Sequence, residues 1–148
     1  MKRWQIALAI LAAFAIGELD PVGSVWWKLA EARLPEIKKE SLARPSPFSS
    51  IPRASWVGEN DDVFAFNDRN HDAPVHILIA PKRRYATILD APPLILSEMF
   101  ALALSLARQK HIAQSGFRLV INTNPQGTQS VYHLHLHLIG GRQLRACD

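Results

Sequence analysis

The run VYHLHLHLIGG at residues 131–141 limits the possible folds more than any other part of the sequence. Histidine and leucine alternate in it, and successive side chains of a β-strand point to opposite faces of a sheet. The run therefore predicts a final strand at residues 131–139 with a leucine face and a histidine face. The leucine face needs an apolar partner, so the histidine face points away from that partner, toward solvent or a cleft. The histidines on this face are His133, His135 and His137.

A long apolar segment, residues 93–111, is predicted to form the helix that covers the leucine face. Its polar side chains fall within one narrow arc at helical spacing. The remaining wide apolar face indicates burial on two sides, one of which we interpret as a subunit interface. Further strands are predicted at residues 62–66, 75–80 and 117–122. The order β, β, α, β, β is typical of an α+β domain in which a mostly antiparallel sheet carries a helix on one face.

The N-terminus has the pattern of a targeting segment. Residues 1–3 carry two positive charges, and residues 4–17 contain no charge and consist mainly of Ala, Ile and Leu. This length suits the core of a signal peptide and is short for a transmembrane helix. We therefore expect residues 1–17 to be a signal peptide or membrane anchor, with membrane association through residues 4–17 and an exported, periplasmic or membrane-anchored location. The alternative is a buried N-terminal helix in a cytoplasmic protein.

Residues 18–50 are predicted to be a helical and linker segment that precedes the domain at residues 51–148. A helix is expected over residues 25–40, divided in two by Pro35, because proline is unfavourable inside a helix. Residues 41–52 contain three prolines and four serines, a composition typical of a linker.

The composition limits the classes of molecule that the protein is expected to bind. The net charge of +4 suits an anionic ligand. The sequence has no helix-turn-helix pattern, RNA-module aromatic motif or long basic stripe, so no nucleic-acid partner is expected. The only cysteine, Cys147, excludes an internal disulfide and a cysteine-rich zinc site. The histidine row is therefore the main candidate for chemistry.

The residues alone leave three interpretations of the histidine row. It could be a polar strand face without chemistry. It could bind zinc, for which neutral imidazole is a good ligand, with a further ligand from Asp68, Asp72 or His76. It could also act on phosphorus, because a neutral histidine is a competent nucleophile. Flanking histidines could then hold phosphate oxygens or transfer a proton near neutral pH.

Two longer stretches resemble the histidine triad (HIT) family, and more closely its Hint branch of nucleotide-binding proteins. HLHLHLIGG is similar to the family's signature of alternating histidines. GFRLVINTNPQGTQSVYHLHLHLIGGRQL and AFNDRNHDAPVHILIAPKRR are similar to the Hint branch on both sides of it. The resemblance covers residues 51–144 and implies the HIT-like α+β fold and a homodimer. Because His137 stands where the related nucleotidylyl transferases carry glutamine, it implies hydrolysis rather than transfer.

The resemblance also implies a mechanism with no metal and no cofactor. His135 matches the histidine that attacks the α-phosphorus of a purine nucleotide or nucleotidyl conjugate, such as a nucleoside 5′-phosphoramidate, and forms a covalent nucleotidyl-histidine. His133 and His137 match the pair expected to orient it, contact phosphate oxygens and assist the leaving group. His76, within Ala-Pro-x-His, matches the family's fourth histidine.

Four further residues match the family's substrate-binding positions. Asp68 corresponds to the acidic residue that holds the ribose hydroxyls. Asn122, Gln129 and Ser130 correspond to polar residues on the phosphate and leaving-group side. A turn cap at Asp68 and a strand-end turn at Asn122 are the alternatives that the residues leave open.

The sequence departs from the family pattern in several places. Arg69 stands near the base at a position that is usually apolar, and Thr128 replaces a glycine of the phosphate loop. The family's first strand has no clear match before Ile51. Two alternatives therefore stay open: a zinc-binding or zinc-dependent protein that uses the three histidines of the row, and a nucleotide-binding module without turnover.

Overall fold

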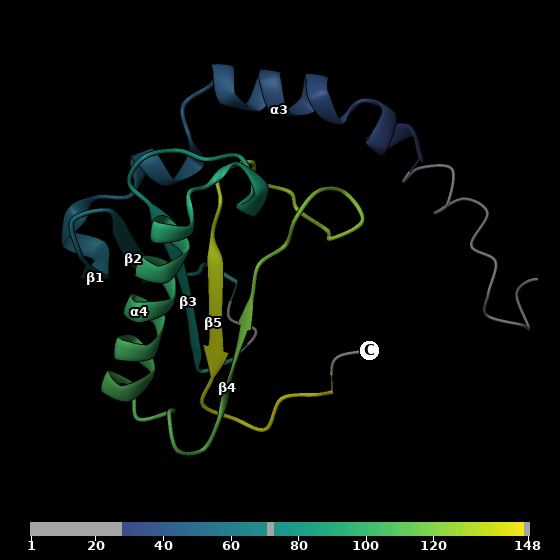
Figure 1. Ribbon diagram of the computed structural model, residues 1–148. Helices are drawn as coiled ribbons and strands as arrows, with labels where there is room; N and C mark the ends of the chain where they lie inside the picture. Colours follow the sequence, from purple (N-terminus) through teal and green to yellow (C-terminus); the bar gives the residue numbers. More distant parts are fainter. Residues whose placement is uncertain (1–27, 71–72, 147–148) are drawn as a thin grey trace, which may run out of the picture.

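The structure is a computed structural model that describes residues 28–70 and 73–146. The predicted signal peptide or anchor at residues 1–17 lies outside the described residues. Within the described part, no helix combines the length and the apolar character that a membrane span requires. The helices and strands, shown in Figure 1, are α3 (Leu34–Ala43), β1 (Trp56–Glu59), β2 (Val63–Asn67), β3 (Val75–Pro81), α4 (Pro93–Gln109), β4 (Phe117–Val120) and β5 (Leu136–Gly140).

The five strands form one antiparallel sheet in the order β1-β2-β3-β5-β4. The α+β prediction is confirmed, and β2, β3, α4 and β4 lie where the sequence predicts them, to within two residues at each end. β1 is a short strand that the sequence interpretation missed. After it, the side-chain oxygen of Asn60 accepts the N–H groups of Asp62 and Val63, which closes a tight turn into β2.

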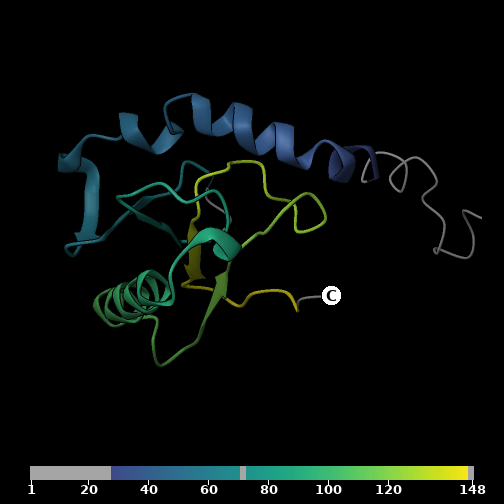
Figure 2. The ribbon, with the colours of Figure 1, turned by 45° about the horizontal axis from the view of Figure 1, so that its top comes forward.

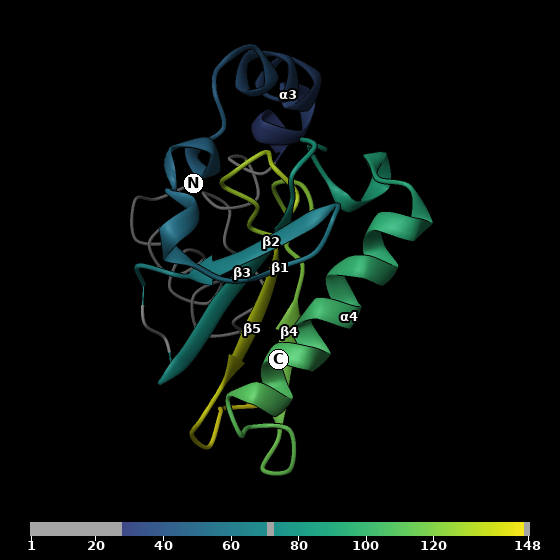
Figure 3. The same ribbon diagram turned by 90° about the vertical axis from the view of Figure 1, so that its left-hand side faces the viewer.

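Helix α4 covers one face of the sheet, as Figure 3 shows. Leu134, Leu136 and Leu138 are at most 1% exposed and share one apolar core with Met99 and Leu106 of α4. The predicted leucine face is therefore confirmed. Since side chains alternate along a strand, the histidines lie on the face that α4 does not cover.

The last strand is shorter than predicted, because β5 begins at Leu136 rather than at residue 131. The neighbouring strand β3 ends at Pro81, which has no N–H to donate to the ladder. Residues 131–135 do not pair with β3. The N–H of Leu134 instead donates to the carbonyl of Tyr85 at 2.7 Å. Of the three histidines in the row, only His137 lies within the strand.

The chain before the sheet is helical, with a break at Arg33. Residues 28–32 are helical, and α3 begins at Leu34. Pro35 therefore lies in the first turn of α3, where a helix tolerates a missing N–H. The predicted division into two pieces is confirmed. Figure 2 shows α3 apart from α4, and in Figure 1 it lies beyond the end of the sheet at which β5 begins.

Residues 44–51, which we call the N-terminal strap, lead from α3 back to the sheet. They include a short 3-10 helix, Pro47–Ser50. Its Phe48 side chain is 7% exposed and packs with Phe64, Phe66 and Leu78 on the sheet face opposite α4. This corrects the prediction of a linker over residues 41–52, because one large apolar side chain among the prolines and serines anchors the segment on the sheet.

Candidate active site

Four histidines lie on the sheet face opposite α4. His137 belongs to β5, His133 and His135 to the segment before it, and His76 to the neighbouring strand β3. They point away from the helix, as predicted, but the strap covers part of the row. The ring centroid of Phe48 lies 5.1 Å from that of His133 and 5.4 Å from that of His135. His133 and His135 are 4% and 8% exposed.

His135 is held in one tautomer. Its Nδ1 lies 2.7 Å from the backbone oxygen of His133, and because a carbonyl oxygen only accepts, Nδ1 carries the proton. Burial lowers the pKa of His135, although the hydrogen bond to His133 and the charge of Asp68 act in the opposite direction. At neutral pH the ring is therefore neutral, and the lone pair of Nε2 is available to attack an electrophile.

His133 is also held in one tautomer, by a bond at each ring nitrogen. Nε2 donates to the backbone oxygen of Pro81 at 2.8 Å, so Nδ1 accepts a hydrogen bond from the Ser46 hydroxyl at 2.6 Å. Burial lowers the pKa of His133 to about 4, and the positive charge of Arg84 acts in the same direction. The ring is neutral and fully bonded within the protein. Its predicted contact with phosphate oxygens stays a prediction.

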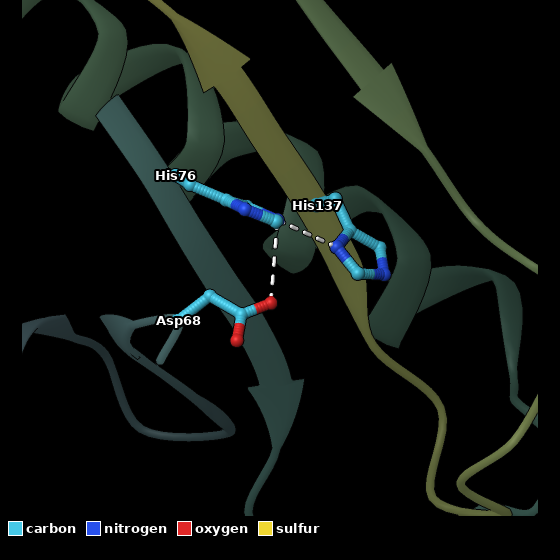
Figure 4. A group of neighbouring side chains, drawn as sticks. All are labelled: Asp68, His76 and His137. Atoms are coloured by element: carbon cyan, nitrogen blue, oxygen red, sulfur yellow. Dashed lines mark hydrogen bonds and ion pairs between the residues drawn. The ribbon is translucent and has the colours of Figure 1, made fainter. Parts of the chain in front are cut away.

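His76 joins His137 to Asp68, as Figure 4 shows. Its Nδ1 donates to the backbone oxygen of Asn70 at 2.6 Å, while its Nε2 lies 3.0 Å from Nδ1 of His137 and 3.3 Å from Oδ2 of Asp68. Nε2 of His76 therefore contacts an imidazole nitrogen and a carboxylate oxygen at the same time. These contacts form a path along which a proton can pass beside His135.

Asp68 caps a turn, which is one of the two roles that the sequence left open, and its contact with ribose hydroxyls stays a prediction. Its Oδ1 accepts the backbone N–H of Asn70 at 3.0 Å, which is a turn cap, and its Oδ2 faces His76. Within the described residues, the group with ligating atoms close enough for a metal ion is Asp68, His76 and His137. The zinc alternative placed the ion on the three histidines of the row, with a further ligand from Asp68, Asp72 or His76. This group contains only His137 from the row, together with Asp68 and His76. Asp72, another residue considered for zinc, lies outside the described residues.

The predicted phosphate-side residues lie in the loop between β4 and the histidine row. Asn122 is half-buried just after β4, and Ser130 is exposed next to the row. The Gln129 side chain is buried and bonded to the backbone: it accepts from the N–H of Asn124 at 2.9 Å and donates to the carbonyl of Ala86 at 2.7 Å. In this arrangement Gln129 shapes the loop, and a direct contact with phosphate stays a prediction.

Two cavities flank the strap. One, of about 680 Å³, is lined by apolar side chains such as Phe66 and Leu78 and by Asp68 and Arg69. The other, of about 440 Å³, is lined by residues that include Trp56, Phe64, Lys82, Arg84 and His133. Both cavities share Phe48 of the strap as a wall.

Sequence reasoning missed two residues that touch the histidine row. Ser46 binds His133, and Phe48 contacts the rings of His133 and His135. Phe48 is the one aromatic residue among the prolines and serines of residues 41–52, which was the available signal that this segment is anchored. No periodicity or motif marked Ser46.

Comparison with known proteins identifies the family of the chain. The HIT domain family matches residues 51–144. The purine nucleoside phosphoramidase of Escherichia coli (strain K12) is 41% identical over 110 residues, which cover 70% of this chain and 92% of that protein. Adenylylsulfatase HINT1 of Arabidopsis thaliana is 46% identical over 134 residues, 84% of this chain and 88% of that protein.

A solved structure also has the same fold. The crystal structure of a HIT family hydrolase from Legionella pneumophila Philadelphia 1 aligns with a TM-score of 0.59 and 36% sequence identity. The alignment covers 74% of this chain and 94% of that one. The family match begins at residue 51, so the strap lies almost entirely before it.

Proposed function

Because the chain belongs to the HIT domain family, we propose that it hydrolyses nucleoside 5′-phosphoramidates or related nucleotidyl conjugates through a covalent intermediate on His135. The observation that carries the proposal is the buried, neutral His135 ring, whose Nδ1–H is fixed on the backbone oxygen of His133. This tautomer leaves the lone pair on Nε2, the atom that acts as the nucleophile. The relatives named phosphoramidase and adenylylsulfatase support a nucleotidyl substrate.

In the first step, Nε2 of His135 forms a bond to the α-phosphorus as the bond from phosphorus to the leaving amine breaks. The ring becomes cationic, and the carbonyl of His133 stabilises the Nδ1–H, whose acidity rises. In the second step, water attacks phosphorus and the bond to Nε2 breaks. A nucleoside monophosphate is released, and His135 returns to its neutral form.

The leaving amine needs a proton, and the group formed by His76, His137 and Asp68 is the proposed source. The two imidazoles are 3.0 Å apart, and the carboxylate lies 3.3 Å from His76. The pair can give one proton to the amine and recover it from the attacking water, so protons balance over the cycle.

The larger cavity is the proposed nucleoside site. Its apolar walls, which include Phe66 and Leu78, suit a purine base, and Asp68 in its lining suits the ribose hydroxyls. Arg69 adds a charged group to the wall that the family usually keeps apolar. We expect a purine nucleotide because the Escherichia coli relative is named a purine nucleoside phosphoramidase.

We also propose a homodimer and an exported or membrane-anchored location. The side chains of Phe100 and Leu104, one turn apart on α4, are 40% and 41% exposed, which supports burial of this helix face by a second copy. Light scattering after size exclusion would give the mass of the assembly, and a monomer would refute the dimer. The location rests on the charge and apolar patterns of residues 1–17. Cell fractionation with N-terminal sequencing tests it.

The function is tested with adenosine 5′-phosphoramidate as substrate. Wild-type protein should release adenosine monophosphate and give a nucleotidyl adduct by mass spectrometry of quenched reactions. His135→Ala should lower kcat by about 10³-fold or more. The control His111→Asn changes an exposed histidine at a positive φ, a conformation that asparagine tolerates, and should keep full activity.

Two alternatives predict different results in the same assay. A zinc-dependent enzyme would lose activity with a chelator and regain it with zinc, whereas the proposed mechanism keeps full activity. A binding module without turnover would show a nucleotide-dependent rise in Tm but no product. If the wild type gives neither product nor adduct, or if His135→Ala is fully active, the proposed mechanism is wrong.

A further inference from the structure

The N-terminal strap reaches the histidine row through one side chain, Ser46. Its hydroxyl oxygen lies 2.6 Å from Nδ1 of His133, across a separation of 87 residues in the sequence. The same oxygen accepts the backbone N–H of Phe48 at 3.2 Å. A hydroxyl has one proton to donate, and with a lone pair already engaged by Phe48 that proton is directed to His133.

The other ring nitrogen of His133 fixes the direction of this bond. Nε2 lies 2.8 Å from the carbonyl oxygen of Pro81, which only accepts, so Nε2 carries the ring proton and Nδ1 accepts from Ser46. The ring is therefore tethered on one side to the end of β3 and on the other to the strap. A histidine bonded at both nitrogens has a fixed position as well as a fixed tautomer.

The position of His133 matters because its backbone holds the proposed nucleophile. The carbonyl oxygen of His133 accepts the Nδ1–H of His135 at 2.7 Å. We propose that Ser46 is a positioning residue for the reaction: by donating to Nδ1 of His133 it fixes the peptide group that orients His135. This inference rests on the proposed function, in which His135 is the nucleophile.

Other hydrogen bonds hold the strap in the position from which Ser46 reaches His133. The guanidinium of Arg84 donates to the carbonyl of Arg44 at 2.6 Å, to the Ser41 hydroxyl at 2.9 Å and to the carbonyl of Tyr132 at 3.1 Å. It thereby connects the start of the strap to the residue immediately before His133. The distance between Ser46 and His133 thus does not depend on their single hydrogen bond.

The charges around His133 favour the neutral ring that Ser46 binds. Arg84, Lys82 and Arg44 line the cavity beside it, and His135 follows it in the row. All are basic groups, so each opposes a positive charge on the His133 ring. Without the Ser46 donor, Nδ1 would lose its hydrogen bond and be open to a proton, and the orientation of His135 would be less well defined.

The test uses Ser46→Ala, with Ser46→Thr as the variant that keeps the hydroxyl and Ser115→Ala as a control outside the site. The first readout is the set of imidazole ¹⁵N shifts of His133, measured without substrate. The wild type should show a protonated Nε2 and an unprotonated Nδ1 that accepts a hydrogen bond. In Ser46→Ala the Nδ1 signal should shift, whereas the threonine variant and the control should match the wild type.

The second readout is the pH profile of kcat/KM with adenosine 5′-phosphoramidate. Ser46→Ala should lower kcat about 5- to 10-fold, the effect of one lost hydrogen bond, with little change in KM. The acidic limb of its profile should move to higher pH, because His133 is then easier to protonate. Ser46→Thr should restore both the rate and the profile.

Three results would overturn the inference. They are unchanged His133 shifts in Ser46→Ala, changed shifts with an unchanged kcat and pH profile, and a threonine variant as impaired as the alanine variant. The spectra need no turnover, so they separate this inference from the proposed function. If the wild type fails to act on the phosphoramidate, the proposed reaction is wrong, and the shifts still decide whether Ser46 donates to Nδ1 of His133.

Discussion

Acid should destabilise this protein through His133 more than through an exposed histidine. The pKa of His133 is lowered from 6.5 to about 4 in the folded protein, mainly by burial. Between these values the unfolded chain binds a proton that the folded protein does not, so stability that is complete above pH 6.5 is lost as the pH falls toward 4. The loss due to this residue is at most about 2 kcal/mol at pH 5 and about 3 kcal/mol at pH 4.

Urea unfolding at pH 7 and pH 5 measures this contribution. The pH-dependent loss in the free energy of unfolding should be smaller in His133→Gln than in the wild type, by up to about 2 kcal/mol. Glutamine cannot protonate, and its amide can still donate to the carbonyl of Pro81. Carboxylates such as Asp90, whose pKa is lowered by its bond to Thr87, contribute equally in both proteins. Equal losses in the wild type and the variant would refute the assignment of a buried, neutral His133.

Three further predictions concern the strap, the phosphate loop and the ribose site. Phe48→Ala should lower the free energy of unfolding by about 3 kcal/mol, the usual cost of removing a buried phenylalanine; a Tm within a degree of the wild type would contradict this. Thr128 has a φ of 57°, a backbone conformation that is strained for threonine and unstrained for glycine. Thr128→Gly should therefore raise the free energy of unfolding by up to about 1 kcal/mol, once the greater freedom of glycine in the unfolded chain is subtracted. A fall in Tm would contradict this. Asp68→Asn keeps a side chain that can cap the turn but removes the charge, so KM for the phosphoramidate should rise about tenfold; an unchanged KM would exclude a ribose contact.

The alternating pattern predicted much of the architecture because it is a local property of the chain. Histidine and leucine at every second position defined two faces, and the apolar segment of α4 is the partner of the leucine face. The start of β5 could not be predicted in the same way. It depends on Pro81 in the adjacent strand, more than 50 residues away, which cannot continue the hydrogen-bond ladder.

The sequence predicted which residues belong to the site better than it predicted their chemical roles. The sequence named His133 and His137 as an equivalent pair, yet their bonds differ. Both ring nitrogens of His133 are bonded, to Ser46 and to Pro81. His137 instead contacts His76, which in turn faces Asp68. The pairing of β3 with β5 determines this difference, because it places His76 beside His137 and leaves His133 beyond the end of the ladder.

The boundaries of the site also differ from those of the family match. The match covers residues 51–144, while Ser46 and Phe48, which contact His133, lie before it. Neither residue belongs to a helix or strand with a periodic pattern, and their partners are distant in the sequence, so composition alone indicated a linker. In the folded protein the strap is part of the wall around the proposed nucleophile. Differences in the strap between HIT proteins are therefore expected to change the rate and pH dependence of the reaction even where the histidine row is identical.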